Sequence, residues 1–239
     1  MIWVIPMSGK GTRTQELDEF KPFIKIKGHK ILSWFISSIK HLIKNEDSFV
    51  LITTEYFANK FNFEKECKKI FKEHQLNNEI NFIINKETPT GASTTVYSAK
   101  KIINKKIPVM VIFPDQYIDF ILPEIVDNSA YMGIYVQLGN KSGFIEIQNG
   151  LIVNFIEKIN ISNLASSGFY LVSSGKDLIF AFEEQFKNNE TLNGEFYVGP
   201  AFKYLFNKLK VYPIPVLAKY DLGNCKDIAY FYSKNISCL

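Results

Sequence analysis

The chain has few cysteines, and they are not arranged in pairs. Cys67, Cys225 and Cys238 are the three cysteines among 239 residues, and no two of them stand in a C-x-x-C spacing. An odd number of cysteines without paired spacing argues against both a disulfide framework and a zinc site. We therefore expect free thiols.

Long apolar runs and a strong net charge are also missing. The longest apolar runs are far too short for a membrane-spanning helix, and no basic segment precedes the first of them, so we expect neither a signal peptide nor a membrane segment. The net charge is +4, and the lysines are spread along the chain. This distribution predicts neither nucleic acid nor an anionic membrane as a partner, and we expect a cytoplasmic protein.

Linkers, internal repeats and low-complexity tracts are absent as well. With 46% hydrophobic residues, a chain of 239 residues is long enough to enclose one sizeable core. We therefore expect a single domain over residues 1–239.

The most informative segment that is present is the N-terminus. The apolar run Ile2–Pro6 passes directly into the loop Met7–Arg13, which reads M-S-G-K-G-T-R. This loop is neither a Walker loop, G-x-x-x-x-G-K-[ST], nor the dinucleotide fingerprint G-x-G-x-x-G. A buried strand that ends in a glycine loop offers backbone N–H groups to an anion, and Lys10, Arg13 and Lys21 add positive charge. The loop suggests a phosphate site, although such a turn is also typical of an ordinary solvated loop.

Apolar runs alternate with amphipathic stretches in the first half of the chain, which favours an α/β fold with a mostly parallel central sheet. The periodicity predicts strands at 2–6, 49–53, 80–85 and 108–113, and helices at about 30–44, 56–73 and 91–104.

The second half is richer in strands. The pattern predicts strands at 133–138, 143–147, 151–156, 168–172 and 211–216, and helices at about 175–187, 197–209 and 224–234. Gln148-Asn149-Gly150 is a strong hairpin turn between two of these strands.

Further short motifs follow the glycine loop in a fixed order. Lys21-Pro22 precedes an apolar run. The others are Thr90-Gly91-Ala92, Phe113-Pro114-Asp115-Gln116-Tyr117, Ile156-Glu157-Lys158, Ser167-Gly168-Phe169-Tyr170, Gly194-Glu195-Phe196-Tyr197 and Asp221-Leu222-Gly223-Asn224. Together with the G-x-G-T-R loop, this series resembles the sugar-phosphate nucleotidyltransferases, or pyrophosphorylases, over nearly the whole chain. The P-M-x-G-x-G-T-R and D-Q-Y motifs fit one subgroup of that family best.

The resemblance implies a Rossmann-like nucleotidyltransferase fold of the glycosyltransferase-A type, with a nucleotide-binding half at 1–120 and a β-rich acceptor-binding half at 121–239. It also implies that the phosphate of a sugar 1-phosphate attacks the α-phosphorus of a nucleoside triphosphate, giving an NDP-sugar and pyrophosphate. Such a reaction needs in-line positioning and cations rather than strong acid or base catalysis. Mg²⁺ is the implied cofactor, and assembly into a homo-oligomer stays open.

For the nucleotide, the resemblance implies that Arg13 and Lys21 are the catalytic cations on the triphosphate. The implied nucleotide-binding residues are Met7, Ser8, Gly9, Lys10, Gly11, Thr12, Thr90, Gly91 and Ala92. Gly91 would let a flat base approach the backbone, but a plain helix N-cap formed by Thr90 or Ser93 explains this segment equally well. The sequence does not choose among CTP, UTP, dTTP and GTP.

For the metal ion, the resemblance implies Asp115 and Asp221 as ligands. Mg²⁺ prefers one or two carboxylates together with phosphate oxygens and water. Without the other motifs, an aspartate at a strand end is more often a turn or helix-cap residue.

For the acceptor, the resemblance implies Lys158 on its phosphate, Gly168 beside the sugar ring, Glu195 on its hydroxyls and Tyr117 in the same pocket. A surface charge pair is the alternative for Glu157-Lys158.

Several residues depart from the usual family pattern. Ser8 stands where many relatives have alanine or glycine, Pro114-Asp115-Gln116 replaces Gly-Asp-Gly or Ser-Asp, and the usual Pro-Thr pattern after Arg13 is missing. These departures leave the acceptor open, so that a cytidylyltransferase acting on a non-sugar phosphate is an alternative. A nucleotide-sugar-dependent glycosyltransferase of the same fold and a nucleotide sensor without turnover are two others.

Overall fold

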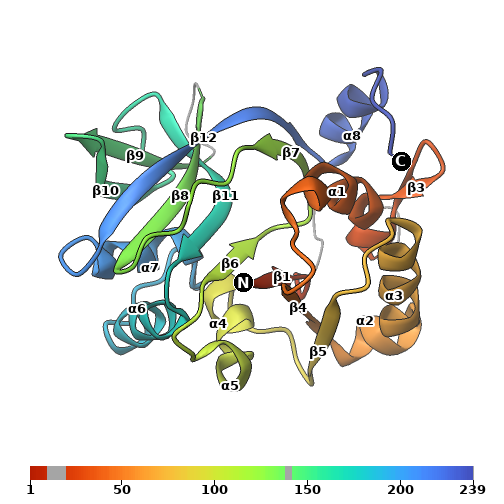
Figure 1. Cartoon of the computed structure of the whole chain (residues 1–239), viewed down its shortest axis with the longest axis horizontal. Helices are drawn as coiled ribbons and strands as arrows, with labels where there is room; N and C mark the ends of the chain where they lie inside the picture. Colours follow the sequence, from red (N-terminus) through yellow and green to blue (C-terminus); the bar gives the residue numbers. More distant parts are fainter. Residues whose placement is uncertain (10–19, 138–141, 239) are drawn as a thin grey trace.

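The apolar N-terminal run is the central strand of a large sheet. A computed structural model describes residues 1–9, 20–137 and 142–238 of the chain (Figure 1). Strand β1 (Ile2–Pro6) is buried throughout and pairs in parallel with β4 (Ser48–Thr54) and β6 (Val109–Ile112). Strand β5 (Glu79–Asn85) continues the parallel part beyond β4. Strands this deep in a parallel sheet are covered on both faces, which explains why they read as continuous apolar runs.

The sheet continues into the second half of the chain without a break. Within the described residues it has ten strands, and its main path runs β5-β4-β1-β6-β11-β8-β12-β7. Strand β11 (Leu164–Val172) is antiparallel to β6 and β8 (Ser129–Val136), whereas β12 (Lys210–Asp221) is parallel to β8. Strand β7 (Gln116–Phe120) forms the far edge beside β12. The hairpin β9 (Gly143–Gln148) and β10 (Leu151–Glu157) joins at β11.

Helices cover both faces of the sheet. Successive side chains of β1 point to opposite faces and are all apolar, so each face needs a cover. Trp3 and Ile5 pack under α1 (Ile31–Ile39) and α3 (Phe63–Glu73), while Ile2 and Val4 pack on the other face. The helices of that second face are α4 (Ala92–Tyr97), α5 (Lys100–Ile103), α6 (Gly175–Lys187) and α7 (Val198–Ala201). Figure 1 shows these two sets on opposite sides of the central strands.

A third, smaller cluster ties the C-terminal region to the first helix. Helix α8 (Cys225–Tyr232) places Phe231 against Trp34 of α1, with the two ring centroids 5.1 Å apart. Short elements complete the fold: η2 (Lys21–Phe23), β2 (Lys25–Ile26), β3 (His29–Lys30), η3 (Lys40–Leu42), α2 (Glu55–Lys60) and η4 (Phe202–Leu205).

The expected α/β fold with a large central sheet is confirmed, and so is the hairpin turn. Asn149 and Gly150 have φ angles of 50° and 77°, which is the left-handed pair that a tight two-residue hairpin requires. The cysteines within the described chain are free, as expected. No helix in the described residues is both long and apolar enough to cross a membrane.

Four expected helices are shorter or broken. The helix predicted at about 30–44 is α-helical only to Ile39 and continues as the 3₁₀ segment η3. The helix predicted at 56–73 is two helices, because Asn62 adopts a left-handed conformation with φ 49°. The one predicted at 91–104 is interrupted after Tyr97, and the one predicted at 197–209 is a single turn followed by the 3₁₀ segment η4. Strand β7 was not predicted, although Gln116, Ile118 and Phe120 alternate as buried residues along it.

Candidate active site

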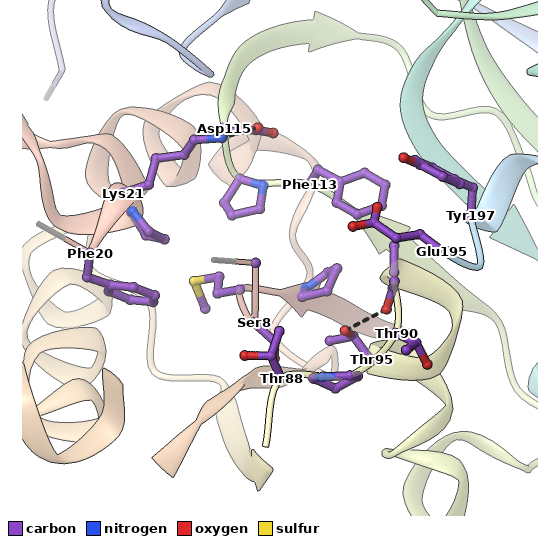
Figure 2. Close-up of a pocket in the computed structure, with 18 of the residues that line it drawn as sticks. Ser8, Phe20, Lys21, Thr88, Thr90, Thr95, Phe113, Asp115, Glu195 and Tyr197 are labelled. Carbon is purple, nitrogen blue, oxygen red and sulfur yellow. Dashed lines mark hydrogen bonds and ion pairs between the residues drawn. The ribbon is translucent and has the colours of Figure 1, made fainter. Parts of the chain in front are cut away.

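A cavity of about 510 Å³ lies where the parallel strands end. The carboxyl ends of parallel strands meet at one edge of a sheet, which is where ligands bind in open α/β folds. The cavity is lined by Pro6 to Gly9 after β1, by Thr88 to Ala92 after β5 and by Phe113 to Asp115 after β6. Lys21, Glu195 and Tyr197 come from more distant segments (Figure 2).

Many of the residues singled out from the sequence line this one cavity. They are Met7, Ser8, Gly9, Lys21, Thr90, Gly91, Ala92, Asp115 and Glu195. Lys10, Gly11, Thr12 and Arg13 lie outside the described residues. The structure therefore brings together residues from the glycine loop and from the motifs that contain Lys21, Thr90, Asp115 and Glu195. Lys21 and Asp115 alone are 94 residues apart in the chain.

Lys21 and Asp115 form an ion pair at one side of the cavity. Lys21 begins the 3₁₀ turn η2, whose buried residues Pro22 and Phe23 anchor it. Its Nζ donates to Asp115 Oδ2 at 2.8 Å, and Figure 2 shows the lysine reaching toward that carboxylate. Burial alone would raise the pKa of Asp115, but the charge and hydrogen bond of Lys21, helped by Lys219, hold this pKa below its usual range. Asp115 is thus a carboxylate kept ionised beside a cation.

Gly91 makes a close backbone contact inside the protein. Its φ is 106°, and a Cβ at this position would come 2.5 Å from both the backbone N and O of Phe196. Phe196 N donates to Thr90 O, and Ser93 N donates to Phe196 O, both at 3.0 Å. Gly91 itself is the N-cap of α4, without a side-chain capping bond, so neither Thr90 nor Ser93 caps the helix. The glycine locks the 88–92 loop to the segment that carries Glu195.

Strand pairing brings Asp221 close to Asp115, but Asp221 does not line the cavity. In the β7–β12 pair Asp221 is opposite Gln116, the residue after Asp115. Leu222 N donates to the backbone O of Asp115 at 2.7 Å, which fixes the two segments together. The Asp221 carboxylate is 55% exposed and pairs with Lys219. Asp115 thus directly precedes β7, and Asp221 ends its partner strand β12, so the two aspartates flank the same end of this strand pair.

Glu195 and Tyr197 form the side of the cavity opposite the Lys21–Asp115 pair in Figure 2. Lys158 does not line the cavity, but its Nζ lies 3.4 Å from Tyr197 Oη and 5.0 Å from the centre of the Tyr197 ring. Burial raises the pKa of Tyr197, while Lys158 lowers it and Glu195 raises it further. These three side chains therefore form one interacting group.

Glu157 is a half-buried carboxylate next to this group. Burial raises the pKa of Glu157, and the neighbouring Lys158 opposes that shift only in part. A carboxylate in such surroundings can hold a proton or accept hydrogen bonds from hydroxyl groups.

Gly168 and Tyr117, which the resemblance places beside the acceptor, both lie outside the lining of the cavity. Gly168 has a φ of 87°, and a Cβ there would meet Gln116 Nε2 at 3.5 Å and the Phe113 ring at 3.6 Å, so it lies behind the cavity wall. Tyr117 points away, because side chains alternate along β7. Its ring packs on Phe231 and Trp34 at centroid distances of 5.6 and 6.5 Å, and it does not line the cavity.

Sequence reasoning did not single out several lining residues. They are Pro6, Phe20, Pro22, Ile31, Thr88, Pro89, Thr95, Phe113 and Pro114. Phe113 and Pro114 directly precede Asp115 in the Phe113–Tyr117 motif, so their position next to a predicted site residue could have indicated them. Phe20 and Thr95 carry no such signal, since a buried aromatic residue and a helix threonine are common in any core.

Among the described residues, no group of three or more His, Cys, Asp or Glu side chains is arranged to hold a metal ion. A magnesium site in a phosphate-binding enzyme needs only one or two carboxylates, because phosphate oxygens and water complete the shell. Asp115 and Asp221 supply that number and lie at the ends of paired strands. Their oxygen donors and location fit such an ion.

No protein-family model matches the chain, and no curated protein sequence is significantly similar to it. Solved structures do share its fold. A nucleoside-diphosphate-sugar pyrophosphorylase from Vibrio cholerae matches with a TM-score of 0.85 and 19% identity, covering 98% of this chain and 100% of that one. An inositol-1-phosphate CTP transferase from T. maritima matches with a TM-score of 0.72 and 13% identity, covering 99% and 98%.

A UDP-glucose pyrophosphorylase in complex with UDP-glucose matches with a TM-score of 0.70 and 18% identity, covering 98% of this chain and 99% of that one. The matches extend over nearly the full length of both chains. The chain therefore has the Rossmann-like fold of nucleotidyltransferases.

Proposed function

We propose that the protein is a nucleotidyltransferase of the pyrophosphorylase type. It joins a nucleoside triphosphate to a phosphorylated acceptor, a sugar 1-phosphate in the first instance, and releases pyrophosphate. The observation that carries the proposal is the cavity at the carboxyl edge of the sheet, which holds a lysine and an ionised aspartate at one side and a glutamate and a tyrosine at the other. Such an arrangement suits two substrates that meet in one site, one of them a polyanion.

In this proposal the first half of the chain binds the triphosphate. Lys21 contacts its phosphates and stabilises the negative charge that develops in the transition state. Arg13, the one arginine in the sequence, also contacts the phosphates. The loops at 7–9 and 88–92 hold the nucleoside through backbone groups, and Phe113 and Pro6 exclude water from it.

The second half binds the acceptor. Lys158 holds the acceptor phosphate, and the carboxylate of Glu195 accepts hydrogen bonds from acceptor hydroxyls.

Asp115 and Asp221 would hold Mg²⁺, which when bound neutralises charge on the reacting phosphates. Attack of the acceptor phosphate oxygen on the α-phosphorus forms one P–O bond and breaks the bond to the β-phosphate, so pyrophosphate leaves and no oxidant or reductant is needed.

The experiment is a screen for pyrophosphate release. CTP, UTP, dTTP and GTP are each tested with Mg²⁺ against hexose 1-phosphates, heptose 1-phosphates, inositol phosphate and amino-alcohol phosphates. Release that needs both substrates supports the proposal. No release with any pair, combined with transfer from a ready-made nucleotide sugar to a sugar acceptor, would show instead a glycosyltransferase.

A further inference from the structure

A lysine is paired with each of the two aspartates that would hold the metal ion. Lys21 Nζ lies 2.8 Å from Asp115 Oδ2, and Lys219 Nζ donates to Asp221 Oδ1. The two aspartates belong to adjoining segments, because Asp221 is opposite Gln116 in the β7–β12 pair. Two ammonium groups therefore neutralise the same two carboxylates that a divalent cation would neutralise.

Lys219 belongs to none of the motifs that identify the site, yet it is firmly placed. Its side chain is only 11% exposed, and its Nζ lies 4.9 Å from the centre of the Tyr135 ring on the neighbouring strand β8. Residues i and i+2 of a strand share a face, so the regular geometry of β12 brings Lys219 to Asp221. A lysine is rarely buried to this extent unless its charge is paired, which indicates a fixed counter-charge.

Lys21 is held less tightly and faces the cavity. Its side chain is 22% exposed and lines the cavity wall. A Cβ on Gly223 would stand 3.5 Å from Asp115 Oδ2 and 3.8 Å from Lys21 Nζ, so the ion pair rests against the backbone that leads into α8. Lys21 therefore contacts the carboxylate and the cavity at the same time.

We propose that Lys21 and Lys219 are counter-charges that occupy Asp115 and Asp221 in the metal-free protein, so that a divalent cation binds well only when a triphosphate draws Lys21 away. Lys219 is then a positioning residue, which acts through Asp221. The inference rests on the proposed function, because that function supplies the metal ion and the triphosphate.

The physical reason is the repulsion between like charges at short range. A dication within a few ångströms of two ammonium groups in a partly buried site pays a large electrostatic cost, which water screens only in part. A triphosphate gives Lys21 a new partner and so removes the part of that cost that is due to Lys21. By thermodynamic reciprocity, the metal ion must strengthen triphosphate binding by the same factor by which the triphosphate strengthens metal binding.

The experiment measures Mn²⁺ binding without nucleotide, by electron paramagnetic resonance of free Mn²⁺. Wild-type protein is compared with Lys21→Met and Lys219→Met. Removal of either counter-charge is expected to lower the Kd for Mn²⁺ at least tenfold. The matched control is Lys100→Met, because Lys100 pairs with Glu183 at 2.5 Å. This substitution also leaves a carboxylate without its lysine, and it changes the net charge by the same amount as the other two variants. That control should stay within twofold of wild type.

Two further variants keep the test decisive. Asp115→Asn added to Lys219→Met should abolish the gain, because the metal would lose one of its two carboxylates. Lys219→Gln keeps a polar tip beside Asp221 and replaces Lys219→Met if circular dichroism shows that the methionine variant is unfolded. Equal Mn²⁺ affinity in wild type, Lys21→Met and the folded Lys219 variant overturns the inference.

The outcome is separable from that of the proposed function, because no turnover is measured. Tighter Mn²⁺ binding in the lysine variants with no pyrophosphate release from any substrate pair would refute the function alone. Release of pyrophosphate together with unchanged Mn²⁺ binding would refute the two-lysine inference alone.

Discussion

Single residues decide the chemistry of the cavity through the partners they have there. Asp115 keeps its charge because Lys21 lies 2.8 Å away, whereas burial raises the pKa of Glu157 because Lys158 compensates only partly. The two carboxylates therefore behave differently, because their partners differ. One carboxylate suits a cation, and the other suits a hydroxyl group or a proton.

Lys21→Ala is expected to lower kcat/KM for pyrophosphate release by at least about a hundredfold, because the variant loses a charge on the triphosphate in the transition state. Arg13→Ala should have a comparable effect. Lys25→Ala is the control, since Lys25 is exposed and lies in the same segment. Circular dichroism should show intact folds in all three. Wild-type kinetics in the Lys21 variant would contradict the triphosphate assignment.

Lys158→Asn is expected to raise KM for the acceptor much more than KM for the nucleotide. The substitution removes a charge contact to one substrate only. Asparagine is chosen because Lys158 has a φ of 59°, a left-handed conformation that asparagine tolerates well. Steady-state kinetics with each substrate varied in turn gives the comparison. Equal increases in both KM values would show that the acceptor phosphate binds elsewhere.

At the scale of elements, the site depends on how loops from different strands lock together. Thr90 and Ser93, on either side of Gly91, each form a backbone hydrogen bond with Phe196, and this contact joins the 88–92 loop to the segment that carries Glu195. A local turn also decides how α2 and α3 pack. Asn62 adopts a left-handed conformation, which separates the two helices. Local turns therefore position long-range contacts.

Gly91→Ala is expected to lower the free energy of unfolding by more than about 3 kcal/mol, because it adds a clash with the Phe196 backbone to the cost of a glycine-only conformation. Gly150→Ala is the control. Gly150 also has a positive φ, 77°, but a Cβ there meets nothing within 4 Å, so its loss should be about 1 kcal/mol. Urea unfolding measures both. Similar losses in the two variants would show that the Phe196 contact is dispensable.

At the scale of the whole molecule, a buried polar cluster connects the first helix, the third helix and the C-terminal segment. Ser33 Oγ lies 2.8 Å from His74 Nε2 and 3.6 Å from Cys238 Sγ. Burial lowers the pKa of His74 from 6.5 to about 4, so the native imidazole is neutral at physiological pH. Protonation of His74 would place a charge inside this junction.

The pH dependence of stability follows from that pKa. Between pH 6.5 and 4 the unfolded chain binds a proton at His74 that the folded chain does not, so the free energy of unfolding falls as the pH falls through this range. The expected loss from this group is about 2 kcal/mol between pH 6.5 and 5.

Urea unfolding at several pH values measures this slope. His74→Gln should flatten it, because the variant has no imidazole at this position. An unchanged slope in the His74 variant would contradict the assignment.

The sequence by itself determined the elements whose signal is local. The continuous apolar run of β1, the Asn149-Gly150 turn and the ordered motifs around Lys21, Asp115 and Glu195 are all readable from neighbouring residues, because periodicity, turn chemistry and glycine content act over a few positions. They were sufficient to predict the α/β fold and much of the cavity lining.

Only the tertiary structure decided which side chains face one another. Strand pairing between segments far apart in the chain decides the position of Asp221 beside Asp115, the burial of Lys219 and the direction of Tyr117. The contact that requires Gly91 depends on Phe196, which is also distant in the sequence. Such pairing is set by the register of β7 against β12 and by packing across the sheet. A local pattern does not contain this information, because the energy that selects the register comes from the assembled core.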